Sequence, residues 1–521
     1  MALSSQISRR KTAFWGLISH YGSVAISLLS GFILLPISLR FIPKDVYGAW
    51  LASGNVLAWL TVVDPGLGAI VQQRVAEAFG RKQCSDITSL AWSGLLINSI
   101  LAVGTIAVGL LARGYLPTLL RLPPEMDVSP ILRAFEWAAL GTGLSIVAFT
   151  VSNIGVGMQA TTGIGIPYLC IALASIVLTV LLLYAGLGIL AAPIANCFRG
   201  GLLLLWTAGY VVVRFRREKI PLMPRFQHTA HLLKLSVYTF VSNGMWTLSS
   251  NIDSFLVARL LGPSQVPMFR ATRTTVESSR MLVERPFVAL MPALSHLAGA
   301  GEIGKARALL IRITTMGIWG VVLLGGGFMA LNRELVGLWM GADFYCGGLV
   351  NLLLCLGLIA GALTSGLTNI CFSLGAIAKA SKIRAVQAAF QVAGMVGLGW
   401  WLGMAGIAAA PLAASILFCG WAVTRLFGGL MDFGRVDYLA LGRELIRSVV
   451  AASVALGVTR LLNASSWPRL LVAAGLFVAC YGTSLYILAP PLRAELSRAT
   501  TMVRRRLSGG AGRETNSGSV E

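Results

Sequence analysis

Apolar segments of about twenty residues recur along the whole chain, and short polar connections separate them. A helix of about twenty residues spans the ~30 Å hydrocarbon core of a bilayer. We count about fourteen such segments, centred near Ser27, Leu60, Ser99, Leu144, Ser175, Leu203, Thr247, Arg280, Val321, Ala360, Val392, Ser415, Val454 and Phe477. Because transmembrane strands would instead be short and alternating, the pattern predicts an all-α polytopic membrane protein.

Composition and charge agree with a chain embedded in a membrane. Of its 521 residues, 56% are hydrophobic and only 12% are charged, whereas soluble domains carry about 25% charged residues. A net charge of +22 would suggest nucleic acid as a partner of a soluble protein. Here Lys and Arg instead favour one set of alternate loops by about three to one. We therefore expect no nucleic-acid partner, and we expect both termini in the cytoplasm.

The chain divides into two similar halves followed by an additional pair of spans. The segment LRFIPKDVYG (39–48) resembles ARLLGPSQVPMF (258–269), and an even number of spans in each half makes the two halves parallel repeats. We predict two six-helix lobes, two further helices and a basic cytoplasmic tail that we expect to be disordered, with the boundaries 1–225, 226–430, 431–492 and 493–521.

Charged residues interrupt the apolar sequence of the eighth span. Five of them follow one another at steps of three and four and so share one stripe of a helix: Arg270, Arg273, Glu277, Arg280 and Glu284. Arg285 lies beside the stripe. A charge at the bilayer centre costs at least about 2.5–3.5 kcal/mol, so such residues normally face a partner or a wet cavity.

The sign of the stripe favours an anionic cargo, because arginine binds phosphate with its planar, permanently charged fork. We predict that Arg270, Arg273 and Arg280 line a substrate cavity. The alternative is that Glu277 and Glu284 only neutralise the arginines as helix pairs.

Three further polar residues within spans are candidates for the same cavity. Asp64 and Asp253 could pair with an arginine or bind a coupling proton, although Asp64 precedes a proline and could instead cap a broken helix. Arg199 is a weaker candidate for substrate binding. Tryptophans such as Trp246 could stack on sugars, but the aromatic belts at membrane interfaces use the same residue, and we favour the belt.

Neither a metal nor another cofactor is expected. The eight cysteines are scattered without a C-x-x-C pair, and no histidine lies at ligand spacing from a cysteine. The segment GAGEIGKA (299–306) nearly matches a phosphate-binding loop, but Ala306 replaces the hydroxyl residue and no strand precedes it. We therefore expect transport driven by an ion gradient, the membrane potential or substrate flux.

The chain resembles the polysaccharide and O-antigen flippases of the multidrug/oligosaccharidyl-lipid/polysaccharide exporter superfamily. The resemblance lies in YGSVAISLLSGFILLPISLRFIPKDVYGAW (21–50), DPGLG (64–68), RVAEAFGRKQ (74–83), NIDSFLVARLLGPSQ (251–265) and ALMPALSHLAGAGE (289–302). It implies two six-helix lobes around a central V-shaped cavity. It also implies a polyprenyl-diphosphate-linked oligosaccharide as substrate, flipped from the cytoplasmic to the periplasmic leaflet of a bacterial inner membrane, with polysaccharide polymerase or export machinery as possible partners.

Three alternatives remain open. A drug or cation antiporter of the same superfamily would favour a cavity with net negative charge, and a lipid II flippase is a further relative. A membrane glycosyltransferase or polymerase would need catalytic groups on a sizeable outer loop or a cytosolic donor-binding domain, and the spacing of the spans predicts neither. The sequence therefore favours a transporter over an enzyme.

Overall fold

A computed structural model of the chain describes residues 22–23, 25–26, 29–60, 67–122, 124–299, 302–462, 464–495, 497 and 500–501. Inside its helices, the side chains at 55–60, 69, 235–243, 281, 285–293, 295–299, 373, 377 and 419–420 are outside this description. Every regular element in the described part of the chain is helical. The expected all-α polytopic membrane protein is therefore confirmed.

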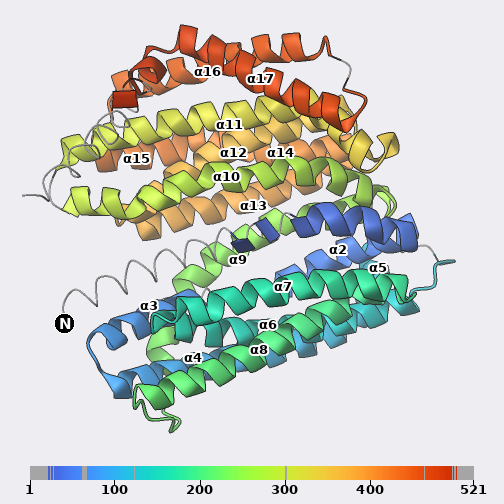
Figure 1. Ribbon diagram of the computed structural model, residues 1–521, viewed down its shortest axis with the longest axis vertical. Helices are drawn as coiled ribbons and strands as arrows, with labels where there is room; N and C mark the ends of the chain where they lie inside the picture. The colour runs from blue at the N-terminus through green and yellow to red at the C-terminus, as the bar shows by residue number, and fades with distance from the viewer. Residues whose placement is uncertain are drawn as a thin grey trace, which may run out of the picture.

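The first half of the chain forms one group of helices, which lies in the lower part of Figure 1. An apolar helix covers Leu29–Phe41. It is followed by α2 (Lys44–Leu60), α3 (Leu67–Gly80), α4 (Cys84–Ala112), the short α5 (Leu116–Leu120), α6 (Ser129–Gly157), α7 (Thr161–Tyr184) and α8 (Ala191–Arg217). Within this N-terminal lobe, α6 packs against α3, α4 and α8, and α7 packs against α8.

The second half forms the upper group in Figure 1, and its first helix, α9, runs between the two groups. It consists of α9 (Thr229–Leu261), α10 (Gln265–Gly299), α11 (Ile303–Trp339), α12 (Gly348–Ser373), α13 (Ile377–Leu402), α14 (Met404–Leu417) and α15 (Thr424–Met431). A π-helical turn, Phe418–Val423, connects α14 to α15. The last two long helices, α16 (Arg435–Thr459) and α17 (Trp467–Leu488), pack against the outside of α11.

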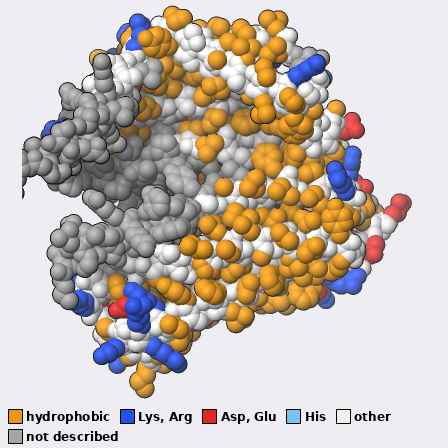
Figure 2. All heavy atoms as spheres, in the orientation of Figure 1, with side chains coloured by type: hydrophobic (Ala, Val, Ile, Leu, Met, Phe, Trp, Pro, Cys, Tyr) orange, Lys and Arg blue, Asp and Glu red, His pale blue; other side chains and the backbone are white. Residues whose placement is uncertain are grey.

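The helices match the predicted spans. With α2 and α3 taken together, and α14 and α15 likewise, the described helices give about fourteen spans. Every predicted centre except Ser27, which lies outside the described residues, falls within a helix. Nine helices in the described part are long and apolar enough to cross a membrane by themselves. Figure 2 shows apolar side chains covering the surface between two ends at which charged side chains gather.

Among the described residues, the two lobes share an extended core at the end of the molecule where α9 turns into α10. Gly262 ends α9 with φ +101°, a conformation that residues with a Cβ rarely adopt. One apolar core joins both lobes there and includes Leu35, Phe135, Phe269 and Val336. At the opposite end the described residues form two different cores, and the beginning of α9 joins that of the N-terminal lobe through Leu232. The shared core near the α9–α10 turn thus attaches the lobes, while at the other end the described contacts between them come from α9 against α3 and α4.

Direct contacts between the lobes confirm this attachment. The Trp339 indole N–H donates to the Phe32 carbonyl at 2.8 Å, and the Arg259 guanidinium donates to the Leu119 carbonyl at 2.7 Å. Helix α2 approaches the α9–α10 turn so closely that a Cβ on Gly48 would overlap the carbonyl oxygen of Pro263. Position 48 therefore requires glycine for this packing.

Candidate functional site

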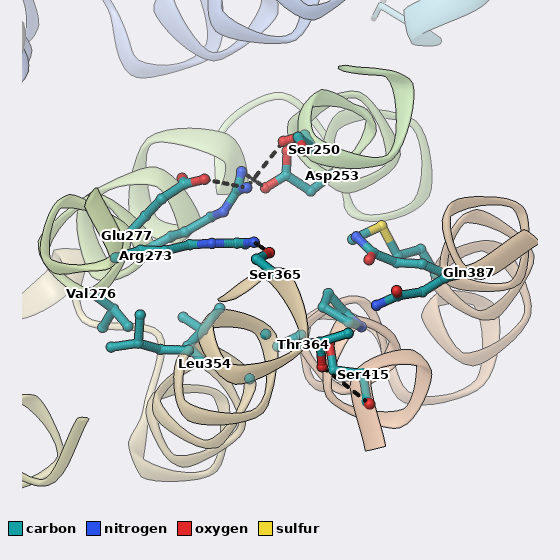
Figure 3. Close-up of a pocket in the computed structure, with 18 of the residues that line it drawn as sticks. Ser250, Asp253, Arg273, Val276, Glu277, Leu354, Thr364, Ser365, Gln387 and Ser415 are labelled. Carbon is teal, nitrogen blue, oxygen red and sulfur yellow. Dashed lines mark hydrogen bonds and ion pairs between the residues drawn. The ribbon is translucent and has the colours of Figure 1, made fainter. Parts of the chain in front are cut away.

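A polar pocket lies inside the C-terminal lobe, surrounded by α9, α10, α12, α13 and α14 (Figure 3). Its volume is about 100 Å³, enough for several water molecules and far too small for an oligosaccharide. Three arginines reach it from two helices: Arg273 and Arg280 from α10 and Arg384 from α13. The charged stripe of α10 therefore faces a polar cavity within one lobe, whereas the sequence pattern suggested the boundary between two lobes.

Arg273 connects α10 to α9 through an ion pair. Its guanidinium pairs with Asp253, a carboxylate that is only 2% exposed. The second terminal nitrogen donates to the Ser250 carbonyl and to Glu277 Oε1, each at 3.1 Å. Arg273 is thereby held by two carboxylates and a carbonyl, which compensates for the cost of burying its charge.

Arg280 lies one to two turns further along α10 and has a different set of partners. Its Nε donates to Glu284 Oε1 at 2.7 Å, and Nη2 donates to the Ser365 hydroxyl on α12 at 2.8 Å. The same guanidinium lies 5.1 Å from the centre of the Trp246 ring. Arg280 thus has one carboxylate partner, while its remaining N–H groups point into a polar space.

Arg384 approaches the same tryptophan from α13. Its guanidinium lies 4.2 Å from the centre of the Trp246 ring. Among the residues that the structure describes, no carboxylate forms an ion pair with it. Trp246 therefore has two arginines against it, an arrangement typical of cation–π stabilisation. This places Trp246 in the pocket, although we favoured a position in the interfacial belt.

Hydroxyl and amide groups complete the pocket wall. Thr364, Ser365 and Thr368 come from α12, Ser415 from α14, and Gln387 and Gln391 from α13. Gln391 donates to the Ser249 carbonyl on α9 at 3.1 Å. Figure 3 shows these polar groups around a common space. They can exchange hydrogen bonds with water or with a polar ligand.

The charges that line the pocket are three arginines against Asp253 and Glu277. Arg273 engages both of these carboxylates, and Glu284 engages Arg280. With Glu284 included, the three arginines face three carboxylates, so the positive charge is local: where Arg280 and Arg384 meet over Trp246, Glu284 is the one carboxylate paired with them in the described structure. Such a place suits an anion such as a phosphate, because guanidinium groups bind phosphate oxygens with paired N–H groups.

The structure places two of the remaining candidates, Arg270 and Arg199, outside this pocket. Arg270 is half-buried on α10 and is not among the pocket residues, and Arg199 is half-buried on α8 in the other lobe. Asp64 lies outside the described residues. Arg285 continues α10, but its side chain is not described. The sequence therefore identified Arg273, Arg280, Glu277 and Asp253 of this pocket.

Arg384 was missed because it stands near the beginning of a span, where Lys379 and Lys382 indicate a loop. A signal was nevertheless present. Gln387 and Gln391 follow Arg384 at steps of three and four, which gives α13 a polar stripe of the same kind as that of α10.

The described residues include no group of three or more His, Cys, Asp or Glu side chains that could hold a metal ion. The charged groups of the pocket are instead Arg273 and Arg280, which have carboxylate partners, those carboxylates, and Arg384, which has no such partner in the described structure. Such a donor set can engage a polar, anionic group through hydrogen bonds and charge.

A multi-pass helical fold with a charged pocket inside one lobe is typical of membrane transporters and flippases. The sequence profile described as polysaccharide biosynthesis protein matches residues 15–298. This is more than half of the chain, and the protein belongs to that family, within the multidrug/oligosaccharidyl-lipid/polysaccharide exporter superfamily. The match includes the charged stripe of α10 and ends before α12 and α13. A comparison with curated protein sequences gives no match.

Solved structures share this fold at low sequence identity. The lipid II flippase MurJ in an inward closed conformation superposes with a TM-score of 0.69 and 13% identity, over 92% of this chain and 99% of MurJ. The eukaryotic MATE transporter AtDTX14 superposes with a TM-score of 0.58 and 15% identity, over 82% of this chain and 99% of AtDTX14. The MATE transporter VcmN of Vibrio cholerae in its bent form superposes with a TM-score of 0.53 and 18% identity, over 83% of this chain and 99% of VcmN.

Proposed function

We propose that this protein flips a polyprenyl-diphosphate-linked oligosaccharide from the cytoplasmic to the periplasmic leaflet during biosynthesis of a cell-surface polysaccharide. The observation that carries the proposal is the meeting of Arg280 and Arg384 over Trp246 in a pocket whose wall also carries hydroxyl and amide groups. A diphosphate needs cationic partners inside the membrane, and arginine keeps its charge there.

The route we propose requires a change of conformation. A pocket of about 100 Å³ admits at most a small polar group, so a glycan would have to pass between the lobes. The lobes share a core at the α9–α10 end, and at the other end their described residues form two different cores. Rocking of the lobes about a site between these ends, with the contacts at the α9–α10 end broken when the other end closes, would alternately expose the two sides of the membrane. In this mechanism Arg270 guides the headgroup along α10, Arg273 holds the pocket wall together through Asp253 and Glu277, and Arg199 contributes from the other lobe.

The drug or cation antiporter remains the principal alternative. It would need a carboxylate that is free to bind the cation. Arg273 occupies both pocket carboxylates, Asp253 and Glu277, which favours the anionic cargo. Asp253 retains a possible role in coupling, because its Oδ1 has no hydrogen-bond partner among the described residues, and Asp64 and Glu284 are proposed for charge pairing or coupling as well.

Lipid II is a second possible cargo, since it would present the same diphosphate to the pocket. A membrane glycosyltransferase or polymerase is the alternative of another class, and the family and fold favour a transporter or flippase over it. We further propose that the chain lies in a bacterial inner membrane with both termini in the cytoplasm. In the same proposal, the two lobes, the last two spans and the cytoplasmic tail meet at residues 225, 430 and 492. The protein would also act together with a polysaccharide polymerase.

Export of surface glycan in cells that depend on this protein tests the proposal. Replacing Arg280 by alanine removes the contacts with Ser365, Glu284 and Trp246 and should abolish export while the protein remains abundant in the membrane. Arg280→Lys keeps the charge but loses the planar fork, so export should be partly retained. Normal export by Arg280→Ala would refute the proposed role of the pocket.

A further inference from the structure

A second basic groove lies on the outer side of the C-terminal lobe, away from the pocket described above. It is formed by α11, by α16 and by residues 490–495, which follow α17, and its volume is about 620 Å³. Three arginines line it: Arg312 on α11, and Arg443 and Arg447 on α16. It shares no residue with the pocket between α9 and α14, so it needs a separate explanation.

The two acidic residues of this groove already have partners. Glu444 is 5% exposed, accepts a hydrogen bond from the Trp319 indole at 3.2 Å and forms an ion pair with Arg447. Glu495 forms an ion pair with Arg312. Arg443 is exposed and forms no ion pair with any residue in the described part of the chain. Three arginines against two glutamates leave one positive charge in excess.

The groove lies toward the end of the helices where α16 begins and α17 has ended, because Pro491 and Glu495, beyond α17, line it. Arg443 follows the first residue of α16 by eight positions, or ~12 Å along a helix of 25 residues. Beyond it, Ile446 and Val450 are 65% and 45% exposed and lie on the same face of α16 as Arg443. Met316, one turn beyond Arg312 on α11, is 42% exposed. A charged rim therefore continues directly into an apolar surface.

We propose that this groove binds an anionic glycerophospholipid of the surrounding membrane. Arg443 holds the phosphate with help from Arg447 and Arg312, and the acyl chains lie along Ile446, Val450 and Met316. Basic pockets between transmembrane helices are suited to such headgroups, since they offer charge at the depth of the phosphate. Two features favour a membrane lipid over the transported substrate: the groove is outside the pocket, and it lies where α16 and α17 cover the outer side of α11.

Electron paramagnetic resonance of spin-labelled lipids tests this assignment. The purified full-length protein is reconstituted in phosphatidylcholine vesicles, and the motionally restricted fraction is compared for spin-labelled phosphatidylglycerol and phosphatidylcholine. The wild type should retain phosphatidylglycerol preferentially. Arg443→Gln should lower that preference about fivefold, the effect of removing one interfacial arginine, and should leave the protein folded because Arg443 has no ion-pair partner in the described structure.

Arg435→Gln is the matched control, because Arg435 is exposed on the same helix and does not line the groove. It should keep the wild-type preference. Equal preference in Arg443→Gln and wild type would overturn the proposal, as would a wild type that does not distinguish the two lipids. Displacement of the labelled lipid by inorganic phosphate would assign the groove to a free anion instead. Displacement by equimolar polyprenyl diphosphate would assign it to the transported lipid, and either result would refute our assignment.

Discussion

Arg273 of α10 and Asp253 of α9 form an ion pair inside the membrane-spanning part of the C-terminal lobe. Their side chains are only 14% and 2% exposed, so neither charge has much access to water. Glu277 adds a second carboxylate to the same guanidinium. The pair therefore supports the structural interpretation of part of the charged stripe: Arg273 holds two helices together, whereas Arg280 and Arg384 keep donors for a ligand.

This division predicts that Asp253→Asn destabilises the protein strongly. Removing one partner of a buried ion pair typically costs about 3–5 kcal/mol; Arg273 would keep Glu277, but that carboxylate is 42% exposed and compensates the buried charge less well than Asp253. The double variant Asp253→Asn/Arg273→Gln should regain most of the loss, because the charge that then loses its partner, Glu277, has access to water. Thermal unfolding of the purified protein in detergent measures the stability of the single and the double variant. Arg74→Gln, in an exposed pair with Glu77, should cost less than about 1 kcal/mol. A single variant as stable as the wild type would contradict the structural role.

Arg384→Gln should reduce glycan export at least about tenfold, equivalent to about 1.4 kcal/mol, because the phosphate would lose a charged contact. The folded protein should be no less stable, since Arg384 has no ion-pair partner in the described structure and its burial is uncompensated. Lys382→Gln provides the control, because Lys382 is exposed on the same helix and should export normally. Loss of stability and export together in Arg384→Gln would instead indicate a structural role.

The aromatic ring of Trp246 should support export by holding Arg280 and Arg384 through cation–π contacts. Trp246→Phe keeps an aromatic face and should retain part of the export activity, whereas Trp246→Ala removes the platform under both arginines and should lose most of it. Export assays at matched protein levels distinguish the two. Trp206→Phe, at an exposed indole that donates to the Gly163 carbonyl, should have little effect. If phenylalanine and alanine at position 246 behaved alike, a cation–π role would be wrong.

Gly48→Ala should weaken the attachment of the two lobes. The added Cβ would overlap the carbonyl of Pro263, so α2 must move away from the α9–α10 turn. Hydrogen–deuterium exchange should become faster in residues 259–267, and the melting temperature should fall. Gly54→Ala on the same helix is the control, because nothing lies within 4 Å of its added Cβ. Unchanged exchange in Gly48→Ala would show that this contact does not fasten the lobes.

The fold could be predicted from the sequence because the thickness of the bilayer sets the length of each apolar segment. The same reasoning identified the α10 stripe, since charges inside an apolar helix are exceptional. The sequence could not show whether these arginines form ion pairs within the protein or bind the substrate, because the carboxylate that engages Arg273 most closely, Asp253, is on another helix. Arg384 was missed for a related reason: three basic residues within six positions indicate a loop, and only packing of α13 against α9 and α14 shows that the third of them faces inward.

The most direct test is translocation by the purified protein in vesicles. A labelled polyprenyl-diphosphate-linked oligosaccharide is placed in both leaflets, and its loss from one leaflet is followed by an enzyme that acts only outside. We predict that the wild type moves the lipid between leaflets, that Arg280→Ala and Arg384→Gln move it at least about tenfold more slowly, and that Lys382→Gln matches the wild type. Failure of the wild type to move the lipid, with proton-driven uptake of a cationic drug by the same vesicles, would contradict the proposed function.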